Sequence, residues 1–324
     1  TGALDDGREW AGRVVGVYRD ANMQTDHVPD ERKVLAPSIT WKPGERTSVT
    51  LLATFQNDRT ASSQQFLPVA ATLLAPPGRR LDHSTFLGEP DFDKLDTKQT
   101  AGTLLVEHAF TDALSAAANL RYVDSSADFN EIYANVYADP QNPFIDADRR
   151  IVNRSLYATR SRIVMLTSDN HLRYVFVTGP LRHELLGGVD YLMYRQQSAS
   201  ASAETTPIDI YAPVYGNYTP VELVADPRLR QTQTGLYAQD QIRWGERTTI
   251  VLGARRDRTT NDVAGALQED RATTYRAGVI VDAGAGVSPY LSYAESFLPV
   301  VGLDIYDRPF KPQRGKQVEA GVKW

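Results

Sequence analysis

The chain has 324 residues, 42% of them hydrophobic, with no cysteine and a net charge of −5. No stretch approaches the roughly 18 consecutive apolar residues that a membrane-spanning helix needs, which excludes a helical membrane bundle. The charge balance and the lack of a basic block give nucleic-acid binding no electrostatic support.

Period-two alternation, the mark of a strand with two different faces, recurs from one end of the chain to the other. In 48–56, Val49, Leu51, Ala53 and Phe55 share one face and polar side chains occupy the other. The stretches 102–110, 114–122 and 317–324 alternate in the same way. A strand that shows apolar side chains on one face only is compatible with a membrane barrel, even at this low overall hydropathy.

The alternation predicts about twelve antiparallel strands and no helix of useful length. Residues 151–178 are read either as one strand or as two, and a single strand keeps all tight turns on the same side. The expected strands are 9–19, 31–41, 46–57, 99–110, 114–124, 151–166 with 170–178, 181–196, 231–243, 247–258, 271–282, 287–297 and 315–324.

The connections between these strands alternate between tight and long. Tight turns are expected at 42–45, 111–113, 178–180, 244–246 and 283–286, and long polar loops at 58–96, 124–150, 198–230 and 297–314. Short turns on one side and long loops on the other are typical of a transmembrane β-barrel whose ends face different compartments. The sequence therefore predicts an all-β, antiparallel transmembrane barrel with short periplasmic turns and long extracellular loops.

Aromatic side chains lie near the ends of many expected strands and next to the turns, as in the interfacial girdle of a membrane barrel. These are Trp10, Trp41, Phe110, Tyr122, Trp244 and Trp324. Asp240 breaks the pattern, because it is in phase with the apolar Leu236 and Ile242. Its position near the 244–246 turn would place it close to the membrane interface, where a carboxylate is tolerated.

Catalytic and metal-binding motifs are absent from the sequence. The segment HELLG at His183 lacks the second histidine of a zinc protease and lies within an expected strand. Gly284-Ala285-Gly286 is a turn with no helix after it, so it is not a phosphate-binding loop. We therefore predict no enzyme activity, no protein-bound metal and no prosthetic group.

The long loops carry aromatic and cationic side chains suited to a binding mouth. The alternative is that these side chains pack the loops against one another, as in compact surface loops. The candidate ligand-binding residues are Tyr133, Tyr137, Tyr211, Tyr215, Tyr218, Tyr306, Arg308 and Phe310.

Five stretches, in order along nearly the whole chain, resemble the TonB-dependent siderophore receptors of the outer membrane, most closely the ferrichrome type. They are LAPSITWKPGERTSVTLLATFQ (35–56), EHAFTDALSAAANLRY (107–122), TGPLRHELLGGVDY (178–191), GLYAQDQIRWGERTTIVLG (235–253) and SYAESFLPVVG with PFKPQRGKQVEAGVKW (292–302 and 309–324). The Y-x-Q-D-Q segment at Tyr237 is the most specific of these motifs.

This resemblance implies a plugged barrel of about 22 strands in the outer membrane of a Gram-negative cell. It also implies an N-terminal plug domain and a TonB box, neither of which is in residues 1–324. The chain is therefore expected to be the central part of the barrel domain, without the final strands, and a fragment or segment of a longer protein.

The resemblance further implies a monomeric receptor for ferric siderophores, of the hydroxamate type, that is energised through TonB. Iron would be carried inside the ligand, and lipid and lipopolysaccharide would surround the barrel. Cobalamin or an oligosaccharide as cargo, a passive porin and an outer-membrane hydrolase are the alternatives. A polar lumen face is expected to include Arg13, Arg19, Arg121, Asp190, Arg255, Asp257 and Glu319.

Overall fold

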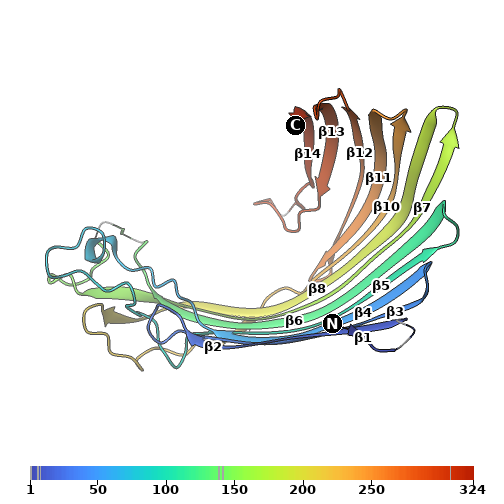
Figure 1. The fold of residues 1–324 in the computed structure, drawn as a ribbon. Coiled ribbons are helices and arrows are strands. Elements are labelled where there is room, and N and C mark those ends of the chain that lie inside the picture. Colours follow the sequence, from blue (N-terminus) through green and yellow to red (C-terminus); the bar gives the residue numbers. More distant parts are fainter. Residues whose placement is uncertain (1, 6, 8, 138, 141, 307) are drawn as a thin grey trace.

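The computed structural model describes residues 2–5, 7, 9–137, 139–140, 142–306 and 308–324. Their strands form one antiparallel sheet whose order follows the chain from β1 to β14, apart from β9, which pairs with β8. Figure 1 shows this sheet as a deeply curved trough, with the long connections of 61–93, 135–150 and 210–223 gathered at one end. Within the described residues, no helix combines the length and the hydropathy needed to cross a membrane.

Twelve of the strands are long, and β1 (Gly2–Ala3) and β9 (Val224–Ala225) are two-residue pieces. The long strands are β2 (Trp10–Asn22), β3 (Pro29–Gly44), β4 (Thr47–Thr60), β5 (Lys94–Ala109), β6 (Leu114–Ala134), β7 (Ile151–Thr178), β8 (Leu181–Asp209), β10 (Leu229–Trp244), β11 (Thr248–Val263), β12 (Ala266–Val281), β13 (Ser288–Leu298) and β14 (Gln313–Lys323).

The predicted strands are confirmed, and 151–178 is a single strand of 28 residues. With 29 residues, β8 is longer still. A membrane crossing needs only about 9–11 tilted residues, so both strands extend well beyond the thickness of a bilayer. The structure thus carries a long extension of the sheet on the side of the long connections.

The sheet has one apolar and one polar face. Directly paired residues of antiparallel strands point to the same side of a sheet, so the register shows which residues share a face. Val49, Val106 and Ala118 lie in one row of the apolar face. Trp10 and Trp41 are paired on this face and stack with ring centroids 5.7 Å apart. The register places all seven expected lumen residues together on the polar face, namely Arg13, Arg19, Arg121, Asp190, Arg255, Asp257 and Glu319.

The five predicted tight turns all lie at the same end of the sheet. One prediction about the opposite end is wrong, because the connection between β11 and β12 is also tight. It consists of Ala264 and Gly265 alone, with φ of 51° and 93°, as in the two-residue turns that match strand twist. The expected loops are also shorter than predicted, since β6 and β8 continue to Ala134 and Asp209.

The largest buried cluster of apolar residues lies among the long connections and the strand ends beside them. It joins three connections and the ends of β6, β7 and β8. Its members are Ala71, Leu81, Leu87, Ala134, Phe144, Val152, Ile208 and Ile210. The only helical element of the described residues, the 3-10 turn η1 (Val69–Ala71), contributes Ala71 to this cluster. The connections therefore have a packed interior of their own.

Candidate ligand-binding site

Three long connections pack into one body, which we call the outer loop assembly. It comprises the described residues of 61–93, 135–150 and 210–223 together with the ends of β6, β7 and β8. Two smaller apolar clusters extend it: Val28, Ala61 and Phe86 form one, and Ile132, Leu156 and Ala158 form the other. Because these clusters draw on segments far apart in the sequence, the loops hold one another in place.

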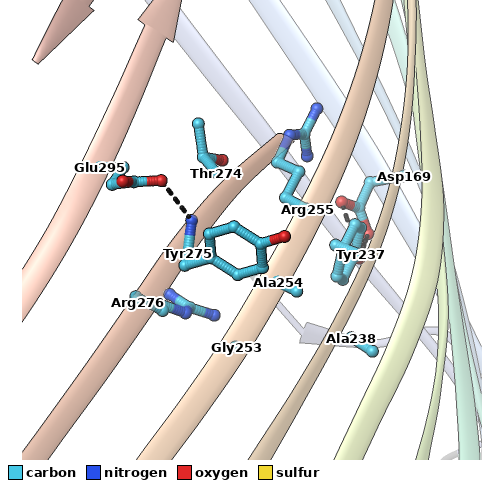
Figure 2. A pocket seen from close by; sticks show the side chains of 10 residues that line it. All are labelled: Asp169, Tyr237, Ala238, Gly253, Ala254, Arg255, Thr274, Tyr275, Arg276 and Glu295. Carbon is cyan, nitrogen blue, oxygen red and sulfur yellow. Dashed lines mark hydrogen bonds between the residues drawn. The ribbon is translucent and has the colours of Figure 1, made fainter. Parts of the chain in front are cut away.

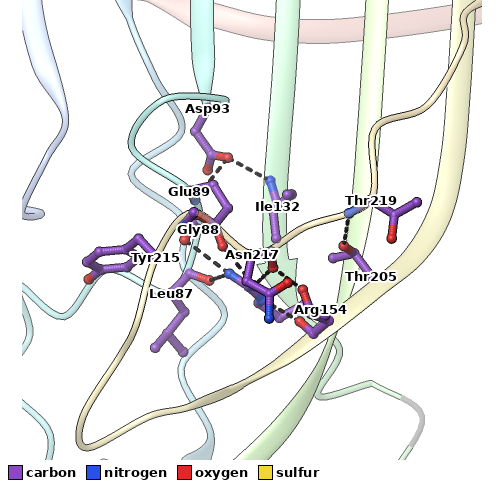
Figure 3. Close-up of polar contacts among 12 residues, drawn as sticks. Leu87, Gly88, Glu89, Asp93, Ile132, Arg154, Thr205, Tyr215, Asn217 and Thr219 are labelled. Carbon is purple, nitrogen blue, oxygen red and sulfur yellow. Dashed lines mark hydrogen bonds and ion pairs between the residues drawn. The ribbon is translucent and has the colours of Figure 1, made fainter.

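A buried ion pair lies at the centre of the outer loop assembly (Figure 3). The Arg154 guanidinium of β7 lies 2.8 Å from the Glu89 carboxylate, and each side chain is only 1% exposed. Arg154 also donates to the carbonyls of Leu87, Gly88, Thr206 and Asn217. Glu89 accepts from the backbone N–H of Gly216 at 2.6 Å. One arginine thus connects β7, β8 and two loops, and its charge is compensated inside the assembly.

Two further buried carboxyl groups, Asp93 and Glu131, lie beside this ion pair, each 8% exposed. Asp93 Oδ1 accepts from the backbone N–H groups of Ile132 and Glu89, whereas its buried Oδ2 has no hydrogen-bond partner among the described residues. The pKa of the Asp93 carboxyl is raised to about 8, mainly by burial and to a smaller extent by the nearby Glu131 and Glu89, against the two backbone hydrogen bonds, which lower it. Asp93 is therefore suited to bind a proton near neutral pH.

Three of the predicted ligand-binding tyrosines connect the loops. The Tyr211 hydroxyl donates to the Arg79 carbonyl at 2.8 Å, and the Tyr215 hydroxyl donates to the Phe86 carbonyl at 3.0 Å. The Tyr218 ring packs against Phe92 with centroids 5.0 Å apart. All three are half-buried. These contacts agree with the alternative that the three tyrosines pack the loops against one another. Ligand contact by these side chains stays a prediction.

Tyr133 is not a loop residue as predicted, because β6 continues through it to Ala134. The prediction ended this strand at residue 124 because apolar and polar residues no longer alternate clearly beyond it, whereas the strand itself continues. Its ring packs edge-on against Phe66 at 5.3 Å, and the Tyr137 ring does so at 5.4 Å. Phe66 has a φ of 47°, a conformation rare for a bulky side chain. Tyr137 is 66% exposed, so this trio presents one aromatic face to solvent.

The last three candidates, Tyr306, Arg308 and Phe310, lie in the connection between β13 and β14. Figure 1 shows this connection well apart from the outer loop assembly. The Arg308 guanidinium lies 5.0 Å from the Tyr306 ring centroid and pairs with Asp304 at 2.9 Å. Phe310 accepts a hydrogen bond at its carbonyl from Gln268 Nε2. The eight candidates therefore form two groups and not a single site.

A hollow of about 420 Å³, which the sequence prediction missed, lies along β10, β11 and β12 and is lined by residues of both faces of the sheet (Figure 2). The Tyr237 hydroxyl donates to Asp169 at 2.9 Å, and Arg255 pairs with both Asp190 and Asp257. Its ten lining residues are Asp169, Tyr237, Ala238, Gly253, Ala254, Arg255, Thr274, Tyr275, Arg276 and Glu295.

The Arg276 side chain makes no hydrogen bond or ion pair with another residue in the described part of the chain, so its guanidinium is a free donor of this hollow. The sequence feature that could have located the hollow is Tyr237 of the Y-x-Q-D-Q segment. The sequence indicates a strand there, but it does not reveal which residue accepts the hydrogen bond of the Tyr237 hydroxyl. A polar wall with one free guanidinium can bind an anionic group or an acceptor of a neighbouring domain.

A family model described as "TonB dependent receptor-like, beta-barrel" matches residues 40–324. The ferrioxamine B receptor of Salmonella typhimurium strain SL1344 is 31% identical, over 100% of this chain and 46% of the relative. The ferrichrome outer membrane transporter/phage receptor of Escherichia coli K12 is 30% identical, over 99% of this chain and 46% of the relative. The chain thus spans about half the length of these curated relatives.

Solved structures agree with the sequence relatives on the fold. The closed form of the ferric-catecholate import receptor Fiu from E. coli K12 superposes with a TM-score of 0.82, at 19% identity, over 98% of this chain and 52% of that one. The ferric preacinetobactin receptor BauA of Acinetobacter baumannii gives 0.79 at 17% identity, over 99% and 48%. The family match, the relatives and the sheet agree that this chain belongs to the TonB-dependent receptor-like β-barrel family.

Proposed function

We propose that residues 1–324 form the central wall of an outer-membrane receptor that takes up ferric siderophores of the hydroxamate type, energised through TonB. Receptors of this family reside in the outer membrane of Gram-negative bacteria, and the chain lies there as a multi-pass sheet. The observation that carries the proposal is 30–31% identity, over essentially the whole chain, to receptors named for ferrioxamine B and ferrichrome. Both compounds hold iron through hydroxamate groups.

The geometry of the outer loops supports this proposal. A ligand-binding mouth requires loops that hold their shape before the ligand arrives, because ordering them on binding would reduce the affinity. The Arg154–Glu89 ion pair and the joint apolar cluster provide such preorganisation. The exposed Tyr137 and Tyr306 rings, 66% and 69% accessible, are two aromatic surfaces among the described residues that a ligand could contact.

Several parts of the proposal concern the whole protein. The complete barrel would have about 22 strands and be filled by a plug domain that carries the TonB box. The side of the hollow that belongs to the polar face, with the unpaired Arg276 side chain, is suited to contact such a plug. The receptor would act as a monomer that transports its cargo, and it would bind no metal other than the iron inside that ligand.

The test is a titration of the full-length gene product in detergent, followed by intrinsic fluorescence. The ligands are ferrioxamine B, ferrichrome, their iron-free forms and cobalamin. Saturable quenching by a ferric hydroxamate below micromolar concentration, with the iron-free form at least about tenfold weaker, is expected. Tyr137→Ala and Tyr306→Ala should each weaken binding about threefold to tenfold. The matched control is Tyr18→Ala, an exposed tyrosine on the apolar face.

Other outcomes identify the alternatives. Saturation by cobalamin alone would keep the receptor fold and reject the siderophore. The same holds for another metallophore, since the metal-pseudopaline receptor CntO of Pseudomonas aeruginosa is 27% identical over 99% of this chain. Large, steady conductance in planar bilayers without any saturable ligand would favour a passive pore over a plugged receptor.

A further inference from the structure

The polar side of β10 carries long amide side chains and no charge between Leu229 and Arg243. Its residues there, which we call the amide stripe, are Gln231, Gln233, Gly235, Tyr237, Gln239 and Gln241. All of them except the glycine are half-buried. A tilted strand gains about 2.5 Å of height per residue, so the stripe extends over about 25 Å, the height of the apolar band of a membrane barrel.

Most amides of this stripe have no partner. Gln233 Nε2 donates to Asp257 Oδ1 at 2.8 Å. The side chains of Gln231, Gln239 and Gln241 make no hydrogen bond with another residue in the described ranges. A side-chain amide offers two N–H donors and one carbonyl acceptor. The stripe therefore presents three free amides to the lumen, one near its outer end and two near its periplasmic end.

The outer end of the stripe meets a second amide without a partner. Gln231 is paired with Asn261 of β11, whose side chain is 1% exposed and whose amide oxygen and nitrogen both lack a hydrogen-bond partner among the described residues. Buried polar groups normally have a partner, so these amides are suited to one from outside the chain. Asn261 is paired in turn with Gln268, which donates to the Phe310 carbonyl at 2.9 Å. The connection that carries three ligand-binding candidates thus contacts the wall beside the stripe.

Near its periplasmic end the stripe lies beside the free guanidinium of Arg276. Gln239, Gly253 and Arg276 are paired in one row across β10, β11 and β12. A Cβ added at Gly253 would lie 2.9 Å from both Cγ and Nε of Arg276, so the arginine side chain crosses the glycine towards β10 (Figure 2). Two side chains with free N–H donors are therefore neighbours here, and both can bind an oxygen acceptor.

The carboxylates beside the stripe already have partners within the chain. Asp190 and Asp257 both pair with Arg255, and Asp169 accepts from the Tyr237 hydroxyl at 2.9 Å. The free groups of this part of the wall are therefore mainly donors. In a ferric hydroxamate the ligand oxygens neutralise the charge of the iron and remain hydrogen-bond acceptors. Uncharged amide donors suit such a complex, because they bind its oxygens without holding it by a strong ionic attraction.

We propose that the amide stripe is the wall along which the ferric hydroxamate passes from the outer mouth towards the periplasm. Its oxygen acceptors would exchange hydrogen bonds from Gln231 to Gln239 and Gln241, with Arg276 as an additional donor, once the plug has moved from this wall. Several weak sites in succession let a ligand enter and also leave, as conduction through a pore requires. This inference rests on the proposed uptake function and adds the residues that guide the cargo.

The test is uptake of ferrioxamine B and ferrichrome loaded with radioactive iron. The cells make the full-length protein and no other receptor for these ligands. Gln239→Leu should lower the maximal uptake rate about threefold, and Gln239→Leu/Gln241→Leu about tenfold, because each hydrogen bond withheld from the moving ligand costs several-fold. The dissociation constant of the ferric ligand, measured in detergent, should change less than about twofold, since the binding mouth is unaltered.

Two further variants separate hydrogen-bond donation from polarity and from general damage to the wall. Gln239→Glu/Gln241→Glu keeps size and polarity but replaces the donors with acceptors, so uptake should fall about as far as in the leucine double variant. The matched control is Gln99→Leu, because Gln99 of β5 is a half-buried glutamine of the same polar face without a hydrogen-bond partner among the described residues. Its uptake rate should equal that of the parent.

The outcomes keep the path and the uptake function apart. Parental uptake in Gln239→Leu/Gln241→Leu, parental uptake in the glutamate variant, or an equal loss in Gln99→Leu and Gln239→Leu would overturn the path. So would a loss of affinity as large as the loss of rate, because it would assign the glutamines to the binding site. If the leucine double variant does not insert, the glutamate variant provides the decisive comparison. A parent that takes up no ferric ligand would reject the uptake function itself, and the path with it.

Discussion

Arg255 of β11 reaches across the intervening strand β10 to Asp190 of β8, with Nη2 2.9 Å from Oδ1. The guanidinium passes over Gly235, whose position in β10 is paired with Asp190 on one side and Asp257 on the other. A Cβ at position 235 would overlap Nη2 and lie 2.6 Å from Cζ of Arg255. The glycine in the GLYAQDQ segment thus leaves the space that this ion pair needs.

Gly235→Ala should displace the guanidinium and weaken the Arg255–Asp190 pair. Because both groups are partly exposed, the expected loss is about 1 kcal/mol of unfolding free energy. Thermal unfolding of the full-length protein in detergent measures it. In an Asp190→Asn background the alanine should have a smaller effect, and an undiminished loss there would show that the ion pair is not the cause.

Tyr237 also reaches across a glycine to an aspartate two strands away, one strand earlier in the sheet than Arg255. There is less room for an added side-chain atom at this glycine. Its ring passes over Gly188 of β8 to reach Asp169 of β7. A Cβ at Gly188 would lie 2.6 Å from the Tyr237 ring and 2.7 Å from the Asn170 carbonyl, which cannot move as a flexible side chain can.

We predict that Gly188→Ala destabilises the full-length protein by about 2–3 kcal/mol, through displacement of the ring and strain at the backbone. Gly187→Ala is the matched control, because the nearest atom to its added Cβ would be 3.9 Å away. Heat-modifiability on gels and thermal unfolding both report the difference. Equal behaviour of the two variants would contradict this account.

The strands could be predicted from the sequence because alternating polarity and tight turns are local signals. Their outer ends could not. The sequence predicts loops at 125–134 and 198–209, whereas β6 and β8 continue through them. From Gln197 to Thr206 the alternation is mainly between serine and alanine, two small residues whose polarity differs too little to mark a strand, and in 125–134 apolar and polar residues mix on both faces. The misplacement of Tyr133 follows directly from this loss of signal.

The candidate site was predictable only in part, for a related reason. Aromatic loop residues can be read from the sequence, but their partners are distant in it: Tyr211 bonds to residue 79 and Tyr215 to residue 86. The buried pair of Arg154 and Glu89 is separated by 65 residues and has no local pattern at all. Packing of the connections against each other decides which aromatic rings stay exposed, and no periodicity encodes that packing.

Arg154→Met should loosen the outer loop assembly without unfolding the sheet. It leaves Glu89 buried without its counter-charge, a change that costs about 3–5 kcal/mol locally. Hydrogen exchange of the 83–93 and 210–217 segments should rise strongly, and ferric ligand affinity should fall. The control is Arg160→Met, since that side chain is exposed and lies 3.4 Å from its partner Asp128. Unchanged exchange in Arg154→Met would mean that the apolar cluster alone orders the loops.

Asp93 should make the outer loop assembly sensitive to pH. Its carboxyl has a pKa of about 8 in the folded protein, raised by burial from an ordinary value of 3.8. The folded state therefore keeps a proton that the opened state loses, so stability is greatest below about pH 4 and falls as the pH rises towards 8. Above that pH the contribution of Asp93 is constant.

The corresponding measurement is local hydrogen exchange across pH 5 to 9, corrected for the intrinsic chemical rate. Asp93→Asn keeps the acceptor that binds the Ile132 N–H but cannot titrate, so it should remove most of the slope. Asp91→Asn, an exposed carboxyl of the same connection, should leave the slope as it is. A slope that persists in Asp93→Asn would assign the proton to another group.

The final prediction concerns the acid that breaks the apolar pattern. Asp240 was expected to be tolerated through closeness to the interface, but the structure provides a specific partner: His183 Nδ1 lies 2.7 Å from its Oδ2. His183 Nε2 in turn lies 2.7 Å from Thr178 Oγ1, and its ring stacks on Phe176 at 4.7 Å. The histidine of the HELLG segment therefore gives a partner to Oδ2 of this carboxyl on the lipid side of the sheet, while the buried Oδ1 has no hydrogen-bond partner among the described residues.

His183→Ala should destabilise the protein by about 1–3 kcal/mol, because it leaves the Asp240 carboxyl without a partner at the membrane edge. Asp240→Ala removes the unsatisfied group together with its hydrogen bond, so the double variant should be more stable than His183→Ala alone. Thermal unfolding of the four proteins of this cycle measures the coupling. Strictly additive effects would show that the interface itself, and not His183, makes the acid tolerable.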